Sequence, residues 1–129
     1  MNSENNIIQS TNEGILCKIR TMYKLIALFE TELESKYSVS LNEGMLLCIL
    51  SKQKQLSSGE IAEQLSLTTS NASKVIKAVE SKKLIRRVIG KSDKRQMYFS
   101  ITEKGLNILS NIKCADLNLP DELKFLCTK

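Results

Sequence analysis

The hydrophobic period of this 129-residue chain changes near Leu84, and this change restricts its architecture more than any other feature. Upstream, apolar residues recur at the three- and four-residue steps of amphipathic helices, as in the stripe from Ile15 to Leu33. Downstream, residues 84–89 and 96–101 have the pattern of two strands that flank a polar, basic loop. We therefore expect a mainly α-helical domain with a small β-hairpin, which is an α+β fold.

Local signals mark where the helices begin. Two capping boxes, Ser40 with Glu43 and Ser57 with Glu60, indicate the starts of a second and a third helix. A fourth helix is predicted over residues 68–79. Residues 102–105 are expected to open a last helical segment, and residues 120–126 a short terminal helix.

The composition argues against a secreted, membrane-bound or enzymatic protein. The N-terminus lacks the pattern of a signal peptide, and no apolar run approaches the roughly 18 residues that span a bilayer. The sequence has no histidine, which is the commonest general base and the commonest nitrogen ligand of metals. We expect a cytoplasmic protein that is not an enzyme, that binds no cofactor or metal and that does not enter membranes.

The cysteines show none of the close spacing of a zinc ribbon or a thioredoxin motif, so free intracellular thiols are expected. Cys48 falls among apolar residues, and we predict that it packs in the core. The four cysteines are Cys17, Cys48, Cys114 and Cys127.

The positive charge is concentrated in one part of the chain. Residues 67–105 carry a net charge of +7, whereas residues 1–66 carry −2 and residues 106–129 carry none. A cationic module of this kind can release counterions from a phosphate backbone. A run of charge is more often only a solvated face, so the charge has to be judged with the pattern that contains it.

Residues 68–79 supply that pattern, because they divide into an apolar and a polar helix face. The apolar positions are Ala72, Val75, Ile76 and Val79. The polar positions include Ser70, Ser73, Lys74 and Lys77. Small polar side chains can donate to and accept from base edges, while lysines neutralise phosphates. An ordinary amphipathic surface helix is the alternative interpretation.

The predicted order of helices and basic hairpin is that of a winged helix-turn-helix, and residues 57–105 resemble the DNA-binding core of the MarR family of bacterial transcriptional regulators. The motifs that carry the resemblance are IAEQL at 61–65, Leu67-Thr68, Ser73-Lys74, LIRR at 84–87, Asp93-x-Arg95 and ITEKG at 101–105. Ser66 and Lys83 stand where that family commonly has glycine. Each is therefore expected to adopt a positive φ at a modest energetic cost.

The resemblance implies a homodimeric, sequence-specific DNA-binding regulator, most often a repressor, that binds a pseudo-palindromic operator. Its recognition helices would enter successive major grooves, and its wings would lie at the minor groove. The implied contact residues are Thr69, Ser70, Asn71, Ser73, Lys74, Lys77, Arg87, Lys91, Asp93, Lys94 and Arg95. Arg95 would reach the minor groove and Asp93 would orient the wing. A small-molecule effector is also implied. The alternative function is a winged-helix module that binds an acidic protein.

The resemblance also divides the chain into four segments. They are a flexible N-terminus (1–13), a dimerisation helix (14–35), the winged helix-turn-helix domain (36–105) and a short C-terminal dimerisation segment (106–129). Only 24 residues follow Gly105, so dimerisation is expected to rest mainly on the first helix.

Cys17 lies in the region where the peroxide-sensing branch of that family keeps a reactive cysteine. Tyr23 and Tyr37 are available as hydroxyl partners. A structural cysteine is the better supported interpretation, because reactivity needs both exposure and a lowered thiol pKa. Cys17 is nevertheless retained as a candidate redox residue.

Overall fold

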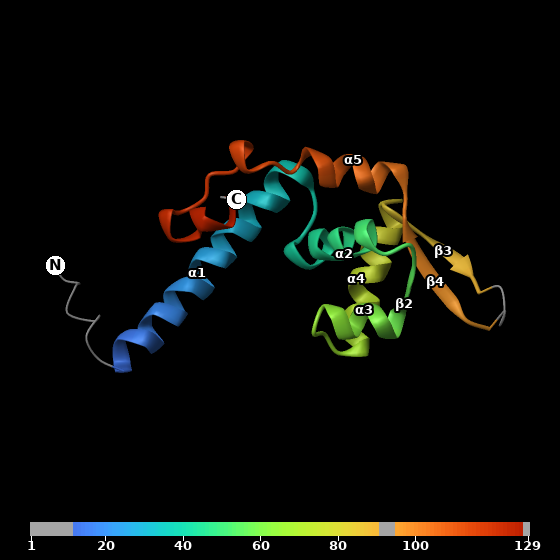
Figure 1. The fold of residues 1–129 in the computed structure, drawn as a ribbon, viewed down its shortest axis with the longest axis horizontal. Coiled ribbons are helices and arrows are strands. Elements are labelled where there is room, and N and C mark those ends of the chain that lie inside the picture. The colour runs from blue at the N-terminus through green and yellow to red at the C-terminus, as the bar shows by residue number, and fades with distance from the viewer. Residues whose placement is uncertain (1–11, 91–94, 128–129) are drawn as a thin grey trace.

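The computed structural model describes residues 12–90 and 95–127 and has an elongated shape, with a long helix at one end and a β-hairpin at the other (Figure 1). The helices are α1 (Asn12–Tyr37), α2 (Leu41–Lys52), α3 (Ser58–Gln64), α4 (Thr69–Ser81) and α5 (Glu103–Asn111). The strands are β2 (Leu56–Ser57), β3 (Ile85–Ile89) and β4 (Met97–Ile101). No helix in the described part of the chain is long and apolar enough to cross a membrane. The mainly helical fold with a small antiparallel sheet confirms the predicted fold class.

The helices begin where the capping signals predict. The hydroxyl of Ser40 accepts a hydrogen bond from the Glu43 N–H at 3.2 Å, and the Glu43 carboxylate accepts one from the Ser40 N–H at 2.8 Å. Ser57 and Glu60 make the same reciprocal pair at the start of α3. Both capping boxes are therefore confirmed, and α4 gains a cap at Thr68, whose hydroxyl accepts from the Asn71 N–H.

The sheet has three antiparallel strands in the order β2-β4-β3. Phe99 at its centre pairs with Leu56 on one side and with Arg87 on the other, and it is buried. Met97 and Ile101 pack against the same core, as the alternation in this strand predicts. Sequence reasoning missed β2, because a strand of two residues is too short to show a period.

The core lies where α2, α3 and α4 meet the sheet. Its most deeply buried side chains are Leu46, Leu47, Ile61, Leu84, Val39 and Val79. Helix α1 contributes to this core mainly through Leu33 near its C-terminal end, whereas its first half exposes large apolar side chains. The apolar surface of α1 is thus wider than the part that the core covers.

Both residues that were predicted to adopt a positive φ do so. Ser66 ends the turn after α3 with φ of 56°, and Lys83 follows α4 with φ of 65°. Both residues occupy the left-handed region, which costs a residue with a Cβ about 1 kcal/mol. Ser38, after α1, adopts φ of 60° and was not predicted to do so.

After α5 the chain forms two 3₁₀ helices, η2 (Cys114–Asp116) and η3 (Asp121–Cys127). η3 lies where the short terminal helix over residues 120–126 was predicted, whereas η2 was not predicted. This C-terminal segment folds back so that the Cα atoms of Cys114 and Cys127 lie 5.8 Å apart, within the usual range for a disulfide, and the two residues are bonded. The prediction of free thiols is therefore wrong for this pair. It holds for Cys17 and Cys48, which are free.

The predicted burial of Cys48 is also wrong. Its side chain is exposed, because α2 turns Leu46, Leu47 and Leu50 toward the core and leaves position 48 on the outer face. The apolar residues around Cys48 in the sequence gave no clear period from which to tell the two faces apart.

Gly105 lies at the closest approach between α5 and the start of the wing. A Cβ at this position would stand 2.3 Å from the Leu84 carbonyl oxygen and 2.8 Å from Ile101 Cγ1. The same carbonyl accepts a hydrogen bond from the Thr102 N–H at 3.0 Å, so it cannot move freely. Glycine at 105 therefore allows α5 to pack on the backbone that leads into β3.

We predict that Gly105→Ala lowers the free energy of unfolding by about 1–3 kcal/mol, because the added methyl must displace backbone. Gly59→Ala is the matched control, since the nearest atom that a Cβ would meet there is Ser57 Oγ at 4.0 Å. The control should be neutral or slightly stabilising, as alanine favours a helix over glycine. Urea denaturation of both variants measures the difference, and equal midpoints would contradict this packing.

Candidate nucleic-acid interface

Helix α4 separates its two faces as the sequence predicts. Ala72, Ile76 and Val79 are buried against the core, with at most 4% of each residue exposed. Every polar residue of α4 in the predicted contact set is exposed. These residues are Thr69, Ser70, Asn71, Ser73, Lys74 and Lys77. The buried face holds the helix, and the small polar face is left open for a partner.

The wing strands extend this polar face into a concave surface. A hollow of about 620 Å³ lies between α4 and the sheet, next to the start of α3. Its lining residues are Ser58, Ser70, Ser73, Lys74, Ile76, Lys77, Arg87, Met97 and Phe99. The structure therefore brings five of the predicted contact residues, four from α4 and Arg87 from β3, around one hollow. Thr69 and Asn71 lie on the exposed start of α4 and do not line it.

Arg87 is held by an acidic residue that sequence reasoning missed. Its Nε donates to Glu80 Oε2 at 2.6 Å, and its guanidinium lies 5.7 Å from the centroid of the Phe99 ring. The hydrogen bond that Arg87 donates to the Glu80 carboxylate, with the attraction of the Glu80 charge, raises the pKa of Arg87 above the ordinary value. The pair ties α4 to β3, so Arg87 positions the β-hairpin against α4.

A second ion pair fixes the other side of α4. Lys82 Nζ donates to Glu43 Oε1 at 2.7 Å and to the Ser38 carbonyl oxygen at 2.8 Å. Glu43 is only 8% exposed, and its carboxylate also caps α2. Lys82 therefore connects the end of α4 with the start of α2 and with the turn that follows α1. No local signal in the sequence indicates this contact, since 39 residues separate the two charges.

The predicted wing contacts fall into two groups. Lys91, Asp93 and Lys94 lie outside the described residues. Arg95 is described and exposed, and it lines a shallow hollow beside the start of α3. At the base of the hairpin the Gly90 N–H donates to the Gln96 carbonyl oxygen at 2.9 Å.

Cys17 lies on α1, away from this surface, and is partly buried. Tyr37 is 20 residues further along the same helix, about 30 Å away at the helical rise, so the two side chains of one chain do not meet. Tyr23 lies about 120° around the helix from Cys17 at 100° per residue. Within a single chain neither tyrosine is placed beside the Cys17 thiol.

We predict that Lys82→Met lowers the free energy of unfolding by about 1–2 kcal/mol, because it leaves the largely buried Glu43 carboxylate without its cation. Lys77→Met is the matched control on the same helix, and its exposed side chain should change stability by less than about 0.5 kcal/mol. Urea titrations monitored by circular dichroism give both values. The same loss in both variants would show that Lys82 does not anchor α4.

Comparisons with known proteins agree with this geometry. Residues 39–97 match the sequence profile of the MarR family. An uncharacterized HTH-type transcriptional regulator of Bacillus subtilis, YwaE, is 32% identical over 93 residues, which cover 72% of this chain and 54% of that protein. The chain thus spans about half the length of this curated relative.

Solved structures share the fold. The transcriptional regulator BldR from Sulfolobus solfataricus aligns with a TM-score of 0.67 and 25% identity, over 74% of this chain and 69% of that one. The Staphylococcus aureus MepR–DNA complex aligns with a TM-score of 0.59 and 22% identity, over 71% of this chain and 76% of that one. The profile match includes α3, all of α4 and the first wing strand, which are the elements that build the concave surface. Residues 39–97 of the chain therefore form a MarR-family domain.

Proposed function

We propose that this protein is a sequence-specific DNA-binding transcriptional regulator that acts as a homodimeric repressor. In this proposal α4 enters the major groove and the wing lies at the minor groove. The observation that carries it is the exposed polar face of α4, which continues into the hollow beside the wing while Ala72, Ile76 and Val79 of the opposite face are buried in the core. The MarR-family domain, and the likeness in fold to a DNA-bound neighbour, support the same function.

The charges on this surface suit a phosphate backbone. Residues 67–105 carry a net charge of +7. Glu80, the acidic residue nearest in sequence to Lys74 and Lys77, is bonded to Arg87. Lysines beside small hydroxyl and amide groups combine neutralisation of phosphates with readout of base edges.

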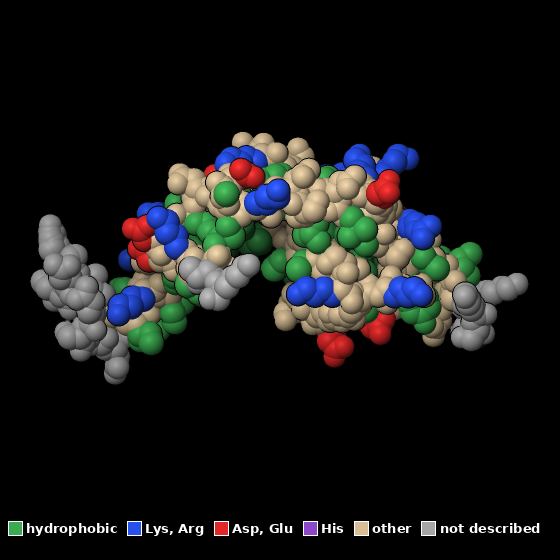
Figure 2. Space-filling model, turned by 45° about the horizontal axis from the view of Figure 1, so that its top comes forward, with side chains coloured by type: hydrophobic (Ala, Val, Ile, Leu, Met, Phe, Trp, Pro, Cys, Tyr) green, Lys and Arg blue, Asp and Glu red, His purple; other side chains and the backbone are tan. Residues whose placement is uncertain are grey.

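The homodimer is supported by the uncovered apolar face of α1. Five large side chains share this face, and each is between 39% and 73% exposed in the single chain. They are Ile15, Leu16, Ile19, Tyr23 and Ile26. Figure 2 shows hydrophobic side chains at the surface of the N-terminal end of α1. Exposed apolar surface of this kind marks an interface. A two-fold dimer through α1 would present two copies of α4 to two half-sites, hence a pseudo-palindromic operator.

The proposal retains three further expectations of the family resemblance. They are a cytoplasmic location where the DNA lies, control by a small-molecule effector, and a C-terminal segment that adds to the dimer interface. Phe125 and Leu126 are each 63% exposed, which supports the last of these. Contacts of Lys91, Asp93, Lys94 and Arg95 with DNA belong to the proposal as well.

We predict that Asn71→Ala or Ser73→Ala costs about 1–3 kcal/mol of binding at particular base pairs and changes binding to random DNA little. Lys91→Ala or Lys94→Ala should weaken binding to all sequences alike and reduce the salt slope by about 1. Fluorescence anisotropy on operator and random duplexes, across a salt series, measures both effects. Asn107→Ala, an exposed helical asparagine outside α4, is the matched control and should leave binding unchanged.

If all four variants affected operator and random duplex equally, the division between base-reading and phosphate-binding residues would be refuted. If the wild-type protein bound both duplexes equally and lost both with salt, sequence-specific regulation would be refuted. The basic surface would then be assigned to an acidic protein partner.

A further inference from the structure

The C-terminal segment, residues 112–127, lies along α1 (Figure 1) and is seated there by a small set of contacts. The Asn118 N–H donates to both carboxylate oxygens of Glu32, at 2.9 and 3.1 Å. Lys36 Nζ donates to the Asp116 carbonyl oxygen and pairs with Glu32 at 3.2 Å. The Asn118 hydrogen bond, aided by Lys36, lowers the pKa of Glu32 below its ordinary value.

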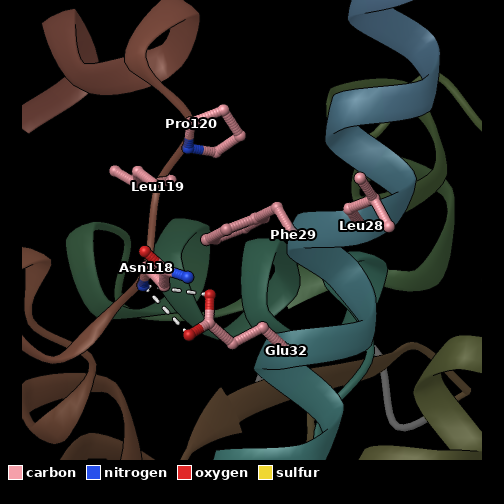
Figure 3. Close-up of a pocket in the computed structure, with 6 residues that line it drawn as sticks. All are labelled: Leu28, Phe29, Glu32, Asn118, Leu119 and Pro120. Carbon is pink, nitrogen blue, oxygen red and sulfur yellow. Dashed lines mark hydrogen bonds between the residues drawn. The ribbon is translucent and has the colours of Figure 1, made fainter.

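An apolar contact accompanies these polar ones. In Figure 3 the Phe29 ring points from α1 toward Leu119 and Pro120, above the Glu32 and Asn118 pair. Further along the segment Leu123 is buried, while Phe125 and Leu126 remain exposed. The described contacts between the segment and α1 are therefore one aromatic contact and a few hydrogen bonds.

The segment itself has little regular structure to keep it in place. Its two 3₁₀ helices are too short to be stable on their own, since such turns gain few backbone bonds for the residues that they order. The Cys114–Cys127 disulfide closes a loop across both turns, with a sequence separation of 13 residues. Such a crosslink restricts the alternatives open to the undocked segment, so the docked form depends on it.

The two cysteines are accessible to small molecules. Cys114 is exposed and Cys127 is partly exposed. Both line an open hollow of about 450 Å³ that Lys124 also borders. A nearby ammonium group favours the thiolate over the thiol, although Lys124 Nζ also pairs with Asp121 Oδ1 at 2.9 Å. An exposed disulfide in such a hollow can be attacked by an external thiol.

Whether this disulfide is permanent or reversible depends on the compartment in which the protein works. That compartment is inferred from the proposed function. A regulator that binds bacterial DNA works where thiols are kept reduced. Disulfides that form in such a compartment are usually transient and redox-sensing, whereas permanent structural disulfides belong to secreted proteins. A crosslink that is accessible and holds a weakly seated segment fits the first class.

We propose that Cys114 and Cys127 form a reversible redox modification site whose oxidant is a low-molecular-weight disulfide, and that its state controls docking of residues 112–127 on α1. The thiolate of one cysteine attacks the small disulfide, forms a mixed disulfide and releases one small thiolate. The second cysteine thiolate attacks the protein sulfur of this mixed disulfide and releases the other. The two protein sulfurs lose two electrons, and the small disulfide becomes two thiols.

Docking of residues 112–127 changes the apolar surface beside α1 that a partner could contact. The oxidised segment, which lies along α1 (Figure 1), exposes Phe125 and Leu126 at its surface, and the apolar face of α1 is itself exposed. The reduced segment no longer holds them there. Oxidation would thus alter the apolar surface available to a second copy of the chain.

The test uses the full chain in buffers with different ratios of reduced to oxidised glutathione. Alkylation and mass spectrometry report the Cys114–Cys127 disulfide, and deuterium uptake of residues 112–127 reports docking in the same samples. We expect the disulfide to form and break reversibly. Uptake in this segment should be about tenfold slower when it is oxidised, with no change in residues 41–81.

Two double variants serve as matched controls. Cys17→Ser with Cys48→Ser removes the free thiols and should retain the full response. Cys114→Ser with Cys127→Ser should show the fast uptake of the reduced segment in both buffers. Uptake that is equal in the two states, or glutathione adducts on these cysteines without a Cys114–Cys127 bond, would overturn the proposal.

A separate anisotropy measurement distinguishes this proposal from the proposed function. DNA binding that is absent in both redox states would refute the regulator, whereas the thiol and exchange measurements would still decide the redox site. A disulfide that persists in excess reduced glutathione would overturn reversibility whatever the DNA result.

Discussion

The burial of one face of α4 is the contact on which the rest of the surface depends. Ala72, Ile76 and Val79 fill positions in the core, so the rotation of the helix about its axis is fixed. Once the rotation is fixed, the small polar side chains on the other face must point outward. The exposed polar surface is therefore a consequence of packing, and a substitution that turned the helix would displace all of these side chains at once.

Two ion pairs near the C-terminal end of α4 complete this positioning. Glu80 holds Arg87 of the wing, and Lys82 holds Glu43 at the start of α2. These pairs engage charges that the sequence alone would have assigned to DNA or to solvent. Because Lys82 also bonds the carbonyl of Ser38, the end of the proposed dimer helix is linked directly to the end of α4. A displacement of the end of α1 would therefore act directly on the end of α4.

Sequence reasoning succeeded where the signal is local and failed where it is not. Capping boxes involve residues three apart, and the faces of α4 follow from a period of 3.6, so both could be predicted. The positive φ of Ser66 and Lys83 followed from the family resemblance. The Cys114–Cys127 bond, the Lys82–Glu43 pair and the exposure of Cys48 depend on how distant segments meet. Contacts between distant segments leave no periodic pattern in the sequence.

In the proposed function, the exposed face of α4 distinguishes one DNA sequence from another. The most direct measurement is fluorescence anisotropy of the reduced protein on the DNA upstream of its own gene and on a scrambled duplex, at physiological salt. We predict that the upstream DNA binds about a thousandfold more tightly or better. Equal affinity for the two duplexes would contradict the account.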